Sequence, residues 1–282
     1  MQISSREREE GRLSPESLAE AVRTFNDVGM VVLEGILDKA FMDQVRSAYD
    51  IELEKELETR GGEEGIKGKT FGLNHIGFFP PMVAPFADVR LSANSFAVQV
   101  SEEILGQDFQ CDFYHTNTAL PDSGIQPIHR DTGMLFGTEL SVPLPCAALV
   151  VNIALCDFTV ENGSTEFWPG THLIVDKTAE EGKHLEARAK NLTSLRTNMP
   201  AGSVALRDLR AWHRGMPNNA DYPRTMFALV YKRGWLSYSQ ISIPQSTWDG
   251  WSERAQQIYR RNTTVPDTLH KPTTWEEIAQ RK

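Results

Sequence analysis

The spacing of apolar residues predicts helices in the first hundred positions of the chain. Leu18, Val22 and Phe25 recur at helical intervals. Ser14 and Pro15 precede them, and a capping hydroxyl followed by proline is a typical helix start. By the same criteria, three helices are expected, at residues 14–29, 38–61 and 92–105, with a short strand at residues 30–33 after the first.

The pattern changes to strands from about Phe109 onward. Short β-branched and apolar runs alternate there with turns rich in Gly, Pro and Asn. Five strands are expected, at residues 110–116, 147–155, 165–168, 203–206 and 224–231. The predicted fold class is mainly β with N-terminal helices, a double-stranded β-helix (a cupin-like jelly roll) braced by those helices.

No linker divides the chain, so we expect one domain over residues 1–282. It would comprise a helical part at about 14–106, a jelly-roll core at about 107–235, and a C-terminal helix and tail at 240–282. Trp248, Trp251 and Ile258 predict one short amphipathic helix in that last part.

Composition narrows the possible partners and compartment. The net charge of −9, with no stripe of Lys and Arg, argues against a nucleic-acid surface. No apolar run approaches the roughly 18 residues that a membrane span needs, and the charged N-terminus lacks a signal-peptide core. Three cysteines without metal-like spacing are expected to be buried free thiols. A cytoplasmic protein acting on a small molecule is expected; the oligomeric state stays open, with a homodimer as one alternative.

An unusual loop lies between the second and third expected helices, at residues 67–81. It is punctuated by glycine and proline yet carries Phe71, Phe78 and Phe79. Two interpretations stay open: the loop packs beneath the helices, or it covers the site as a substrate-contacting lid. In the second case Asn74 and His75, together with Phe71, would face the substrate.

The chemically richest motif is His129-x-Asp131. On an extended segment these two side chains point to the same side, so both could bind one metal ion. They supply two-thirds of a 2-His-1-carboxylate triad, a ligand set that suits non-haem Fe(II) working with oxygen. His213 follows an expected strand far along the chain and is the best candidate for the third ligand. The same donors also bind zinc.

Several stretches together resemble one enzyme family. His129-x-Asp131 and the distant His213 are followed by Arg224, eleven residues beyond that histidine. Residues 26–35, 162–165, 169–172 and 201–204 match further family motifs. Over roughly residues 15 to 235 the chain resembles the phytanoyl-CoA dioxygenase (PhyH) family of Fe(II)/2-oxoglutarate oxygenases.

The resemblance implies a role for each motif residue. His129, Asp131 and His213 would hold Fe(II), and the guanidinium of Arg224 would bind the C5 carboxylate of the cosubstrate 2-oxoglutarate. Gln126 and Thr165 would lie near that cosubstrate. His172 and His115 lack such a partner pattern and are expected to be structural.

The implied reaction is oxidation of a substrate by O2, coupled to decarboxylation of 2-oxoglutarate to succinate. Hydroxylation, desaturation and ring rearrangement are all outcomes within the family, whereas Asp131 argues against its halogenating relatives. We expect a hydrophobic small molecule from secondary-metabolite biosynthesis as the substrate. An acyl-CoA or amino-acid hydroxylase is the alternative within the family; a catalytically silent metal-binding jelly roll and a zinc hydrolase are the alternatives outside it.

Overall fold

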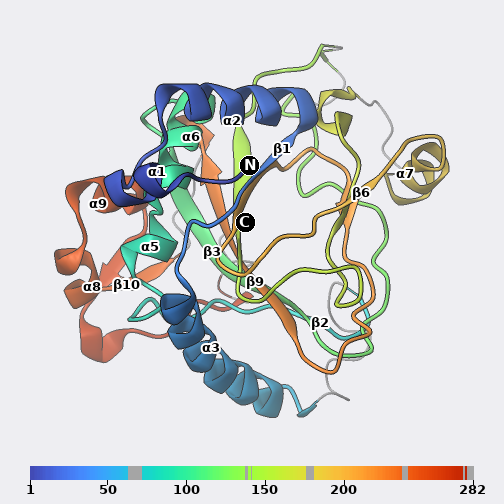
Figure 1. The fold of residues 1–282 in the computed structure, drawn as a ribbon. Coiled ribbons are helices and arrows are strands. Elements are labelled where there is room, and N and C mark those ends of the chain that lie inside the picture. Colours follow the sequence, from blue (N-terminus) through green and yellow to red (C-terminus); the bar gives the residue numbers. More distant parts are fainter. Residues whose placement is uncertain are drawn as a thin grey trace.

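A six-stranded antiparallel sheet forms the centre of the protein in the computed structural model (Figure 1). The structure describes residues 1–62, 72–136, 139–140, 142–175, 181–236, 241–275 and 277. The strand order is β1-β7-β4-β9-β3-β2, so neighbours in the sheet are distant in sequence. The strands are β1 (Met30–Leu33), β2 (His75–Ile76), β3 (Gln110–Ala119), β4 (Ala148–Ala154), β7 (Val204–Asp208) and β9 (Arg224–Lys232).

A smaller sheet in the order β6-β5-β8 completes the barrel. Its strands are β5 (Glu166–Phe167), β6 (Leu195–Arg196) and β8 (His213–Arg214). An isolated antiparallel bridge between His129 and His213 joins the segment of the His-x-Asp motif to β8. The two sheets together form a jelly roll, so the predicted fold class is confirmed.

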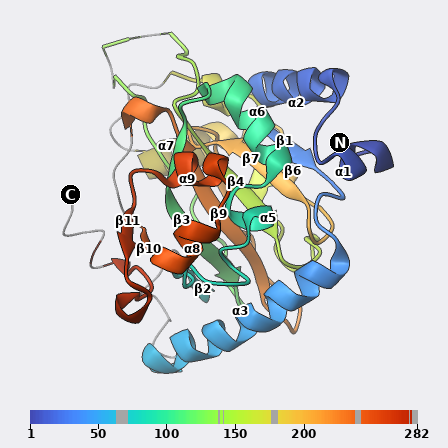
Figure 2. The ribbon, with the colours of Figure 1, turned by 90° about the vertical axis from the view of Figure 1, so that its left-hand side faces the viewer.

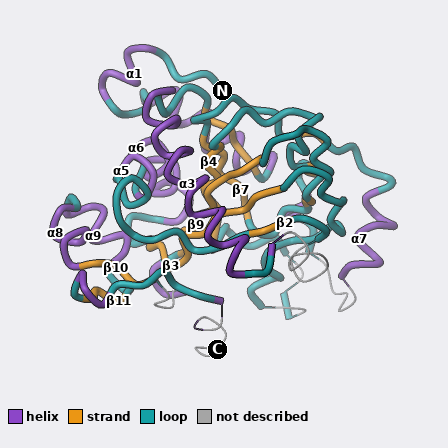
Figure 3. Tube along the Cα trace, turned by 90° about the horizontal axis from the view of Figure 1, so that it is seen from below, coloured by secondary structure: helices purple, strands orange, loops and turns teal. Residues whose placement is uncertain are grey.

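Most of the described helices lie on one side of the six-stranded sheet, and α7 lies apart from them on the other side (Figures 1 and 2). Seen from below, α7 is at the opposite side of the molecule from α8 and α9 (Figure 3). The helices are α1 (Ser5–Glu10), α2 (Pro15–Val28), α3 (Lys39–Thr59), α5 (Val89–Ser92), α6 (Ser95–Leu105), α7 (Glu181–Ala189), α8 (Gln245–Gly250) and α9 (Glu253–Tyr259).

The side chains of strand β4 point alternately to the two faces of the sheet. Leu149, Val151 and Ile153 pack into the large core beneath the helices, whereas Val150 belongs to a small cluster on the other face. This alternation follows from the two-residue period of a strand. All of β4 is buried, as its continuous apolar run predicts.

The first two predicted helices begin and end as expected, and the third does not. The Ser14 side chain accepts a hydrogen bond from Ser17 N, and Gly29 ends α2 with a left-handed φ of 88°. The helix expected at residues 92–105 is α6, which starts at Ser95 and ends at Leu105, and a break separates it from the preceding α5. Asn94 causes the break, because its side chain accepts from Phe96 N and Ala97 N and thereby starts a new helix.

The aromatic residues after α3 support the packing interpretation of that loop. Phe78 stacks on Tyr49 of α3 with ring centroids 5.3 Å apart, and Phe79 packs edge-on against Phe113 of β3 at the same distance. Both phenylalanines are buried. Phe71 lies outside the described residues, so its expected contact with the substrate is untested.

The C-terminal part carries more structure than the single expected helix. Two short helices, α8 and α9, lie in the chain between two strands that pair in parallel, β10 (Ser242–Pro244) and β11 (Thr263–Val265). Helices α1 and α7 were also not predicted. No helix in the described ranges is long and apolar enough to cross a bilayer. The three cysteines are free and buried, as expected.

Candidate metal centre

Three side chains from distant parts of the chain meet at one point. A ligand atom of His129, one of Asp131 and one of His213 all lie within 4.8 Å of one another. The Nε2 atoms of the two histidines are 3.9 Å and 3.6 Å from the same carboxylate oxygen, Oδ1 of Asp131. Since each group would lie about 2.0–2.2 Å from a bound metal, only a small contraction would bring all three onto one ion.

Backbone hydrogen bonds hold this geometry. His129 N donates to His213 O and His213 N donates to His129 O, each at 3.0 Å. Asp131 N donates to Leu209 O at 2.9 Å. The turn around Leu209 is in turn fixed by a two-pronged ion pair between Arg210 and the buried Asp208, with the shorter contact at 2.7 Å.

Both imidazole rings can present Nε2 to a metal. The Nδ1 atom of His129 lies 2.8 Å from Pro127 O, and that of His213 lies 3.1 Å from Ala211 O. A ring whose Nδ1–H donates to a carbonyl keeps the Nε2 lone pair free. In each case the acceptor is the carbonyl two residues before the histidine.

The charges of the site also suit a cation. Burial, together with the nearby Arg207 guanidinium, lowers the pKa of His213 to about 3, so this ring is neutral near pH 7. Burial alone would raise the pKa of Asp131. Arg207 and the two histidines outweigh it and hold the pKa of this carboxyl below its usual range. The site therefore offers the neutral ring of His213 and the ionised carboxylate of Asp131, with Nε2 of His129 beside them.

A small apolar cluster supports the metal centre from behind. Ile128 and Trp212, which directly precede the two histidines, pack with Leu185 of α7. Glu186 of the same helix accepts a hydrogen bond from Ile128 N at 3.1 Å. Helix α7, which no sequence pattern indicated, thus contacts both histidine-bearing segments.

Arg224 is a buried cation whose hydrogen-bonding capacity is not met. It begins β9 and is 1% exposed; its Nε and Nη1 atoms have no hydrogen-bond partner among the described residues. Burial lowers the pKa of this guanidinium to about 10. The ring of Phe158 lies beside it, with the guanidinium carbon 4.9 Å from the ring centroid. A buried charge without a partner is costly, so this position suits an anionic ligand.

Gln126 and His75 lie against the backbone that follows His213. Gly215 N donates to Gln126 Oε1 at 2.8 Å. A Cβ on Gly215 would lie 2.6 Å from that oxygen and 2.9 Å from Cε1 of His75, so a larger residue would displace these two side chains. Burial lowers the pKa of His75 to about 4, and Arg224 contributes to this shift. The structure thus brings Gln126 and His75 to the Arg224 side of the site.

Three further residues were singled out in the sequence: Thr165, Asn74 and His172. Thr165 precedes β5, and its carbonyl accepts from Thr197 N at 2.8 Å. Asn74 is buried with a left-handed φ of 54°, and its Oδ1 has no hydrogen-bond partner in the described part of the chain. His172 has a structural contact, because its Nε2 lies 3.0 Å from the backbone oxygen of Asn26 in α2.

One residue of the site was missed from the sequence. Arg207 of β7 donates from Nη2 to Oδ2 of Asp131 at 2.7 Å and is nearly buried. No local motif points to it, because only the pairing of β7 with β1 and β4 brings it beneath the His-x-Asp segment.

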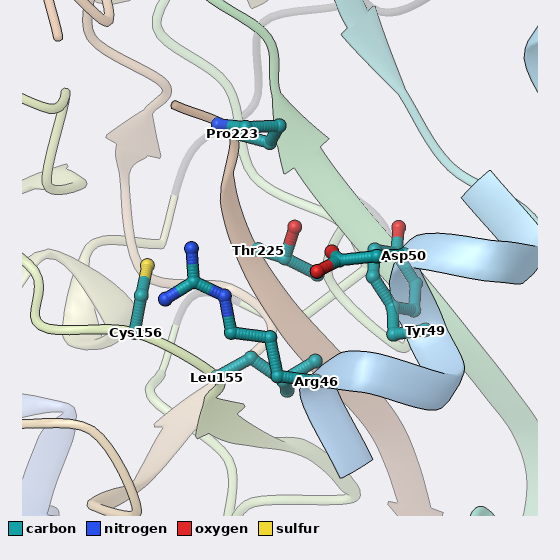
Figure 4. Close-up of a pocket in the computed structure, with 7 residues that line it drawn as sticks. All are labelled: Arg46, Tyr49, Asp50, Leu155, Cys156, Pro223 and Thr225. Atoms are coloured by element: carbon teal, nitrogen blue, oxygen red, sulfur yellow. The ribbon is translucent and has the colours of Figure 1, made fainter. Parts of the chain in front are cut away.

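A small pocket on the helix side is not part of this centre (Figure 4). It is lined by Arg46, Tyr49, Asp50, Leu155, Cys156, Pro223 and Thr225. Its volume of about 10 Å³ has room for about one water molecule. His129, Asp131 and His213 do not line this pocket, so it is not where a substrate of the metal centre would bind.

Comparison with known proteins agrees with the geometry. The model of the family described as phytanoyl-CoA dioxygenase (PhyH) matches residues 25–226. The fold is similar to that of the non-haem alpha-ketoglutarate-dependent epimerase SnoN from nogalamycin biosynthesis. That comparison has a TM-score of 0.60 and 20% identity, and covers 78% of this chain and 84% of that chain. The fold is also similar to that of the non-haem alpha-ketoglutarate-dependent carbocyclase SnoK from nogalamycin biosynthesis. The TM-score is 0.57 and the identity 19%, and the comparison covers 78% of this chain and 84% of that chain.

At these identities the two solved structures support the fold, and the family match carries the assignment. It extends from α2 into β9 and includes His129, Asp131, His213 and Arg224. The resemblance seen in the sequence is confirmed, and with it the expected class of enzyme, an iron- and 2-oxoglutarate-dependent dioxygenase. The chain belongs to the phytanoyl-CoA dioxygenase family.

Proposed function

We propose that the protein oxidises a hydrophobic small molecule in secondary-metabolite biosynthesis, using Fe(II), 2-oxoglutarate and O2. The observation that carries this proposal is the combination of two features in one barrel. One is the cluster of His129, Asp131 and His213; the other is the buried guanidinium of Arg224 with unmet hydrogen-bonding capacity. The first suits a divalent metal and the second suits a carboxylate ligand.

The three residues of the cluster would hold Fe(II) through the two Nε2 atoms and Oδ1 of Asp131. When bound, Fe(II) and 2-oxoglutarate would supply the activation of O2 that oxidises the substrate, with succinate and CO2 as the other products. Three protein ligands leave positions free for the cosubstrate and O2. Histidines bound through Nε2 add no charge, so one carboxylate would leave the ion with a net positive charge that suits further anionic ligands.

Arg224 would bind the C5 carboxylate of 2-oxoglutarate. Its planar fork of donors matches a carboxylate, and burial strengthens the interaction because little water competes. Gln126 and Thr165 would border the same ligand. The placement of Gln126 beside Gly215, close behind His213, supports this role.

The interior face of β9 supports an apolar substrate. Met226, Ala228 and Val230 alternate with fully buried neighbours and are themselves partly exposed, although β9 lies between β4 and β3 in the sheet. Small apolar residues facing accessible space favour a hydrophobic molecule above them. SnoN and SnoK are named as an epimerase and a carbocyclase of nogalamycin biosynthesis. By that analogy, ring formation or rearrangement is included among the outcomes proposed here.

We also propose where the enzyme acts and which further residues border its substrate. The enzyme would act in the cytoplasm on a free small molecule, without nucleic acid or membrane. A homodimer would be compatible with this role. Asn74 and His75 would border the substrate.

A substrate panel tests the proposal. Fe(II)-loaded protein is incubated with 2-oxoglutarate, O2 and one of three compound classes: polycyclic terpenoid or polyketide compounds, acyl-CoA thioesters, or free amino acids. We expect the polycyclic compounds to raise succinate formation above the substrate-free background and to yield a product of altered mass or retention time. Stimulation by acyl-CoA thioesters or amino acids alone would instead favour the alternative hydroxylase within the family.

A further inference from the structure

The two carboxylate oxygens of Asp131 face different partners. Oδ1 lies 3.9 Å from Nε2 of His129 and 3.6 Å from Nε2 of His213, on the side where a metal would bind. Oδ2 lies 2.7 Å from Nη2 of Arg207. The carboxylate is therefore already divided into a metal-facing oxygen and an arginine-facing oxygen.

We propose that Arg207 is a positioning residue that keeps Asp131 a one-oxygen ligand. This inference rests on the proposed metal site. To bind an ion through both oxygens, Asp131 would have to turn Oδ2 away from Arg207. That rotation breaks a charge-assisted hydrogen bond whose arginine side chain is only 8% exposed, where water cannot replace the lost partner.

The contact between Arg207 and Asp131 matters because it sets how many coordination positions of the ion stay free. A six-coordinate ion held by two histidines and one carboxylate oxygen keeps three positions free, whereas a two-oxygen carboxylate would leave two. A cosubstrate that binds through two oxygens needs two positions, and O2 needs a third. Arg207 preserves the third position without touching the metal itself.

The second contact of Arg207 does not compete with this role. Its Nη1 lies 3.1 Å from Nδ1 of His213, which also lies 3.1 Å from Ala211 O. When Nε2 of His213 binds a metal, the ring proton is on Nδ1 and is donated to Ala211 O. Asp131 then remains the strong acceptor for Arg207.

The test uses the full-length protein loaded with Co(II) in the absence of oxygen. Co(II) replaces Fe(II) because its absorption spectrum reports coordination number. The variant Arg207→Met removes charge and donors while keeping length, and Arg207→Lys keeps the charge. Arg233→Met is the matched control, because Arg233 is a partly buried arginine that donates to Cys146 O and Ile104 O.

Three quantities are measured for each protein: the Kd for Co(II), the Asp131 geometry in a crystal structure of the Co(II) form, and the presence of a water ligand on Co(II) when 2-oxoglutarate is also bound. For Arg207→Met we expect a Co(II) Kd within about threefold of the wild-type value, because the second oxygen replaces a water ligand. Both oxygens of Asp131 should then lie on the ion, and the water ligand that the wild type keeps beside bound 2-oxoglutarate should be lost. Arg207→Lys should keep that water ligand, and Arg233→Met should match the wild type.

Two results would overturn the inference. One is an Arg207→Met protein whose Asp131 still binds through one oxygen and whose Co(II) keeps a water ligand beside bound 2-oxoglutarate. The other is loss of Co(II) itself, which would make Arg207 necessary for holding the carboxylate at all. Failure of the wild type to bind 2-oxoglutarate would contradict the proposed function instead, and the Asp131 geometry with metal alone would still decide the role of Arg207.

Discussion

Nε2 of His213 lies 3.6 Å from Oδ1 of Asp131, although β4, β5, β6 and β7 come between these two residues in the chain. The barrel closes this sequence gap because β8 pairs with the segment around His129. Two residues that share no local motif are thus close enough to bind the same metal ion.

The first prediction concerns the metal ligands. Anaerobically purified wild type should bind one Fe(II) per chain. Replacement of His129, Asp131 or His213 by Ala should empty the site and abolish succinate formation, since each supplies one of only three protein ligands. Metal analysis and a turnover assay check this, with the exposed His184→Ala as the control. Full turnover in His213→Ala would exclude this residue as a ligand.

Arg224 should behave differently from the ligands. Loss of one partner of a buried charge pair costs roughly 2–5 kcal/mol, compared with ~0–1 for an exposed pair. Arg224→Ala should therefore raise the apparent KM for 2-oxoglutarate about 30-fold or more, since each 1.4 kcal/mol is about tenfold. Iron binding should persist, and Arg224→Lys should fall between, because it keeps the charge but loses the fork.

A matched control for Arg224 is Arg90→Ala. Arg90 is a half-exposed arginine of α5 that pairs with Asp88. Steady-state kinetics at varied 2-oxoglutarate should show no change for this variant. An unchanged dependence on 2-oxoglutarate in Arg224→Ala would remove Arg224 from the cosubstrate site.

Acid should destabilise the fold partly through His115. Burial lowers the pKa of this ring to about 3, and its Nε2 has no hydrogen-bond partner among the described residues. The unfolded chain protonates it at about pH 6.5, so stability is lost as pH falls from about 6.5 to about 3. Its neighbours include the rings of Phe79 and Trp275, so phenylalanine should fit in its place.

His115→Phe should therefore reduce the loss of unfolding free energy between pH 7.5 and pH 5.0 by about 1–2 kcal/mol. Some acid sensitivity should remain, because the pKa of His75 is also lowered, to about 4. Urea unfolding at the two pH values checks this, with His184→Phe as the exposed control. An identical pH dependence in His115→Phe and wild type would show that His115 is not a source of acid sensitivity.

Gly163 should tolerate no side chain. Its φ of +80° is left-handed, and an added Cβ would collide with Met216 O and lie 2.8 Å from Pro217 O. The left-handed φ strains any residue with a Cβ, and the colliding oxygens belong to backbone that cannot move aside easily. Gly163→Ala should therefore lower the unfolding free energy by about 2 kcal/mol or more. Gly170→Ala is the control, because Gly170 has a similar φ of +75° with open space around it. Equal losses in both variants would leave only backbone strain as the cause.

The sequence was informative where the structure depends on local spacing. Ser14, Asp38 and Gly29 set helix ends that follow from capping alone. The His129-x-Asp131 pair needed only the two-residue period of an extended segment. The start of the third helix was placed too early, at residue 92, because the apolar spacing does not show that the Asn94 side chain caps the helix that begins at Ser95.

Residues that depend on packing between distant elements could not be predicted. Arg207 reaches Asp131 only because β7 lies next to β1 and β4 in the sheet. Helix α7 has a mostly polar sequence, and its Leu185 and Ala189 pack behind the metal centre. No local periodicity marks either contact, since the partners are far apart in the chain.

Oxygen-dependent succinate formation is the measurement that tests the central claim most directly. Metal-free protein is loaded with Fe(II) or with Zn(II) and given 2-oxoglutarate, with and without O2. The Fe(II) form should release succinate only when O2 is present, and the Zn(II) form and the Asp131→Ala variant should release none. Absence of succinate from the Fe(II) form, even with the full substrate panel, would contradict the account and favour a zinc hydrolase or a catalytically silent metal-binding barrel.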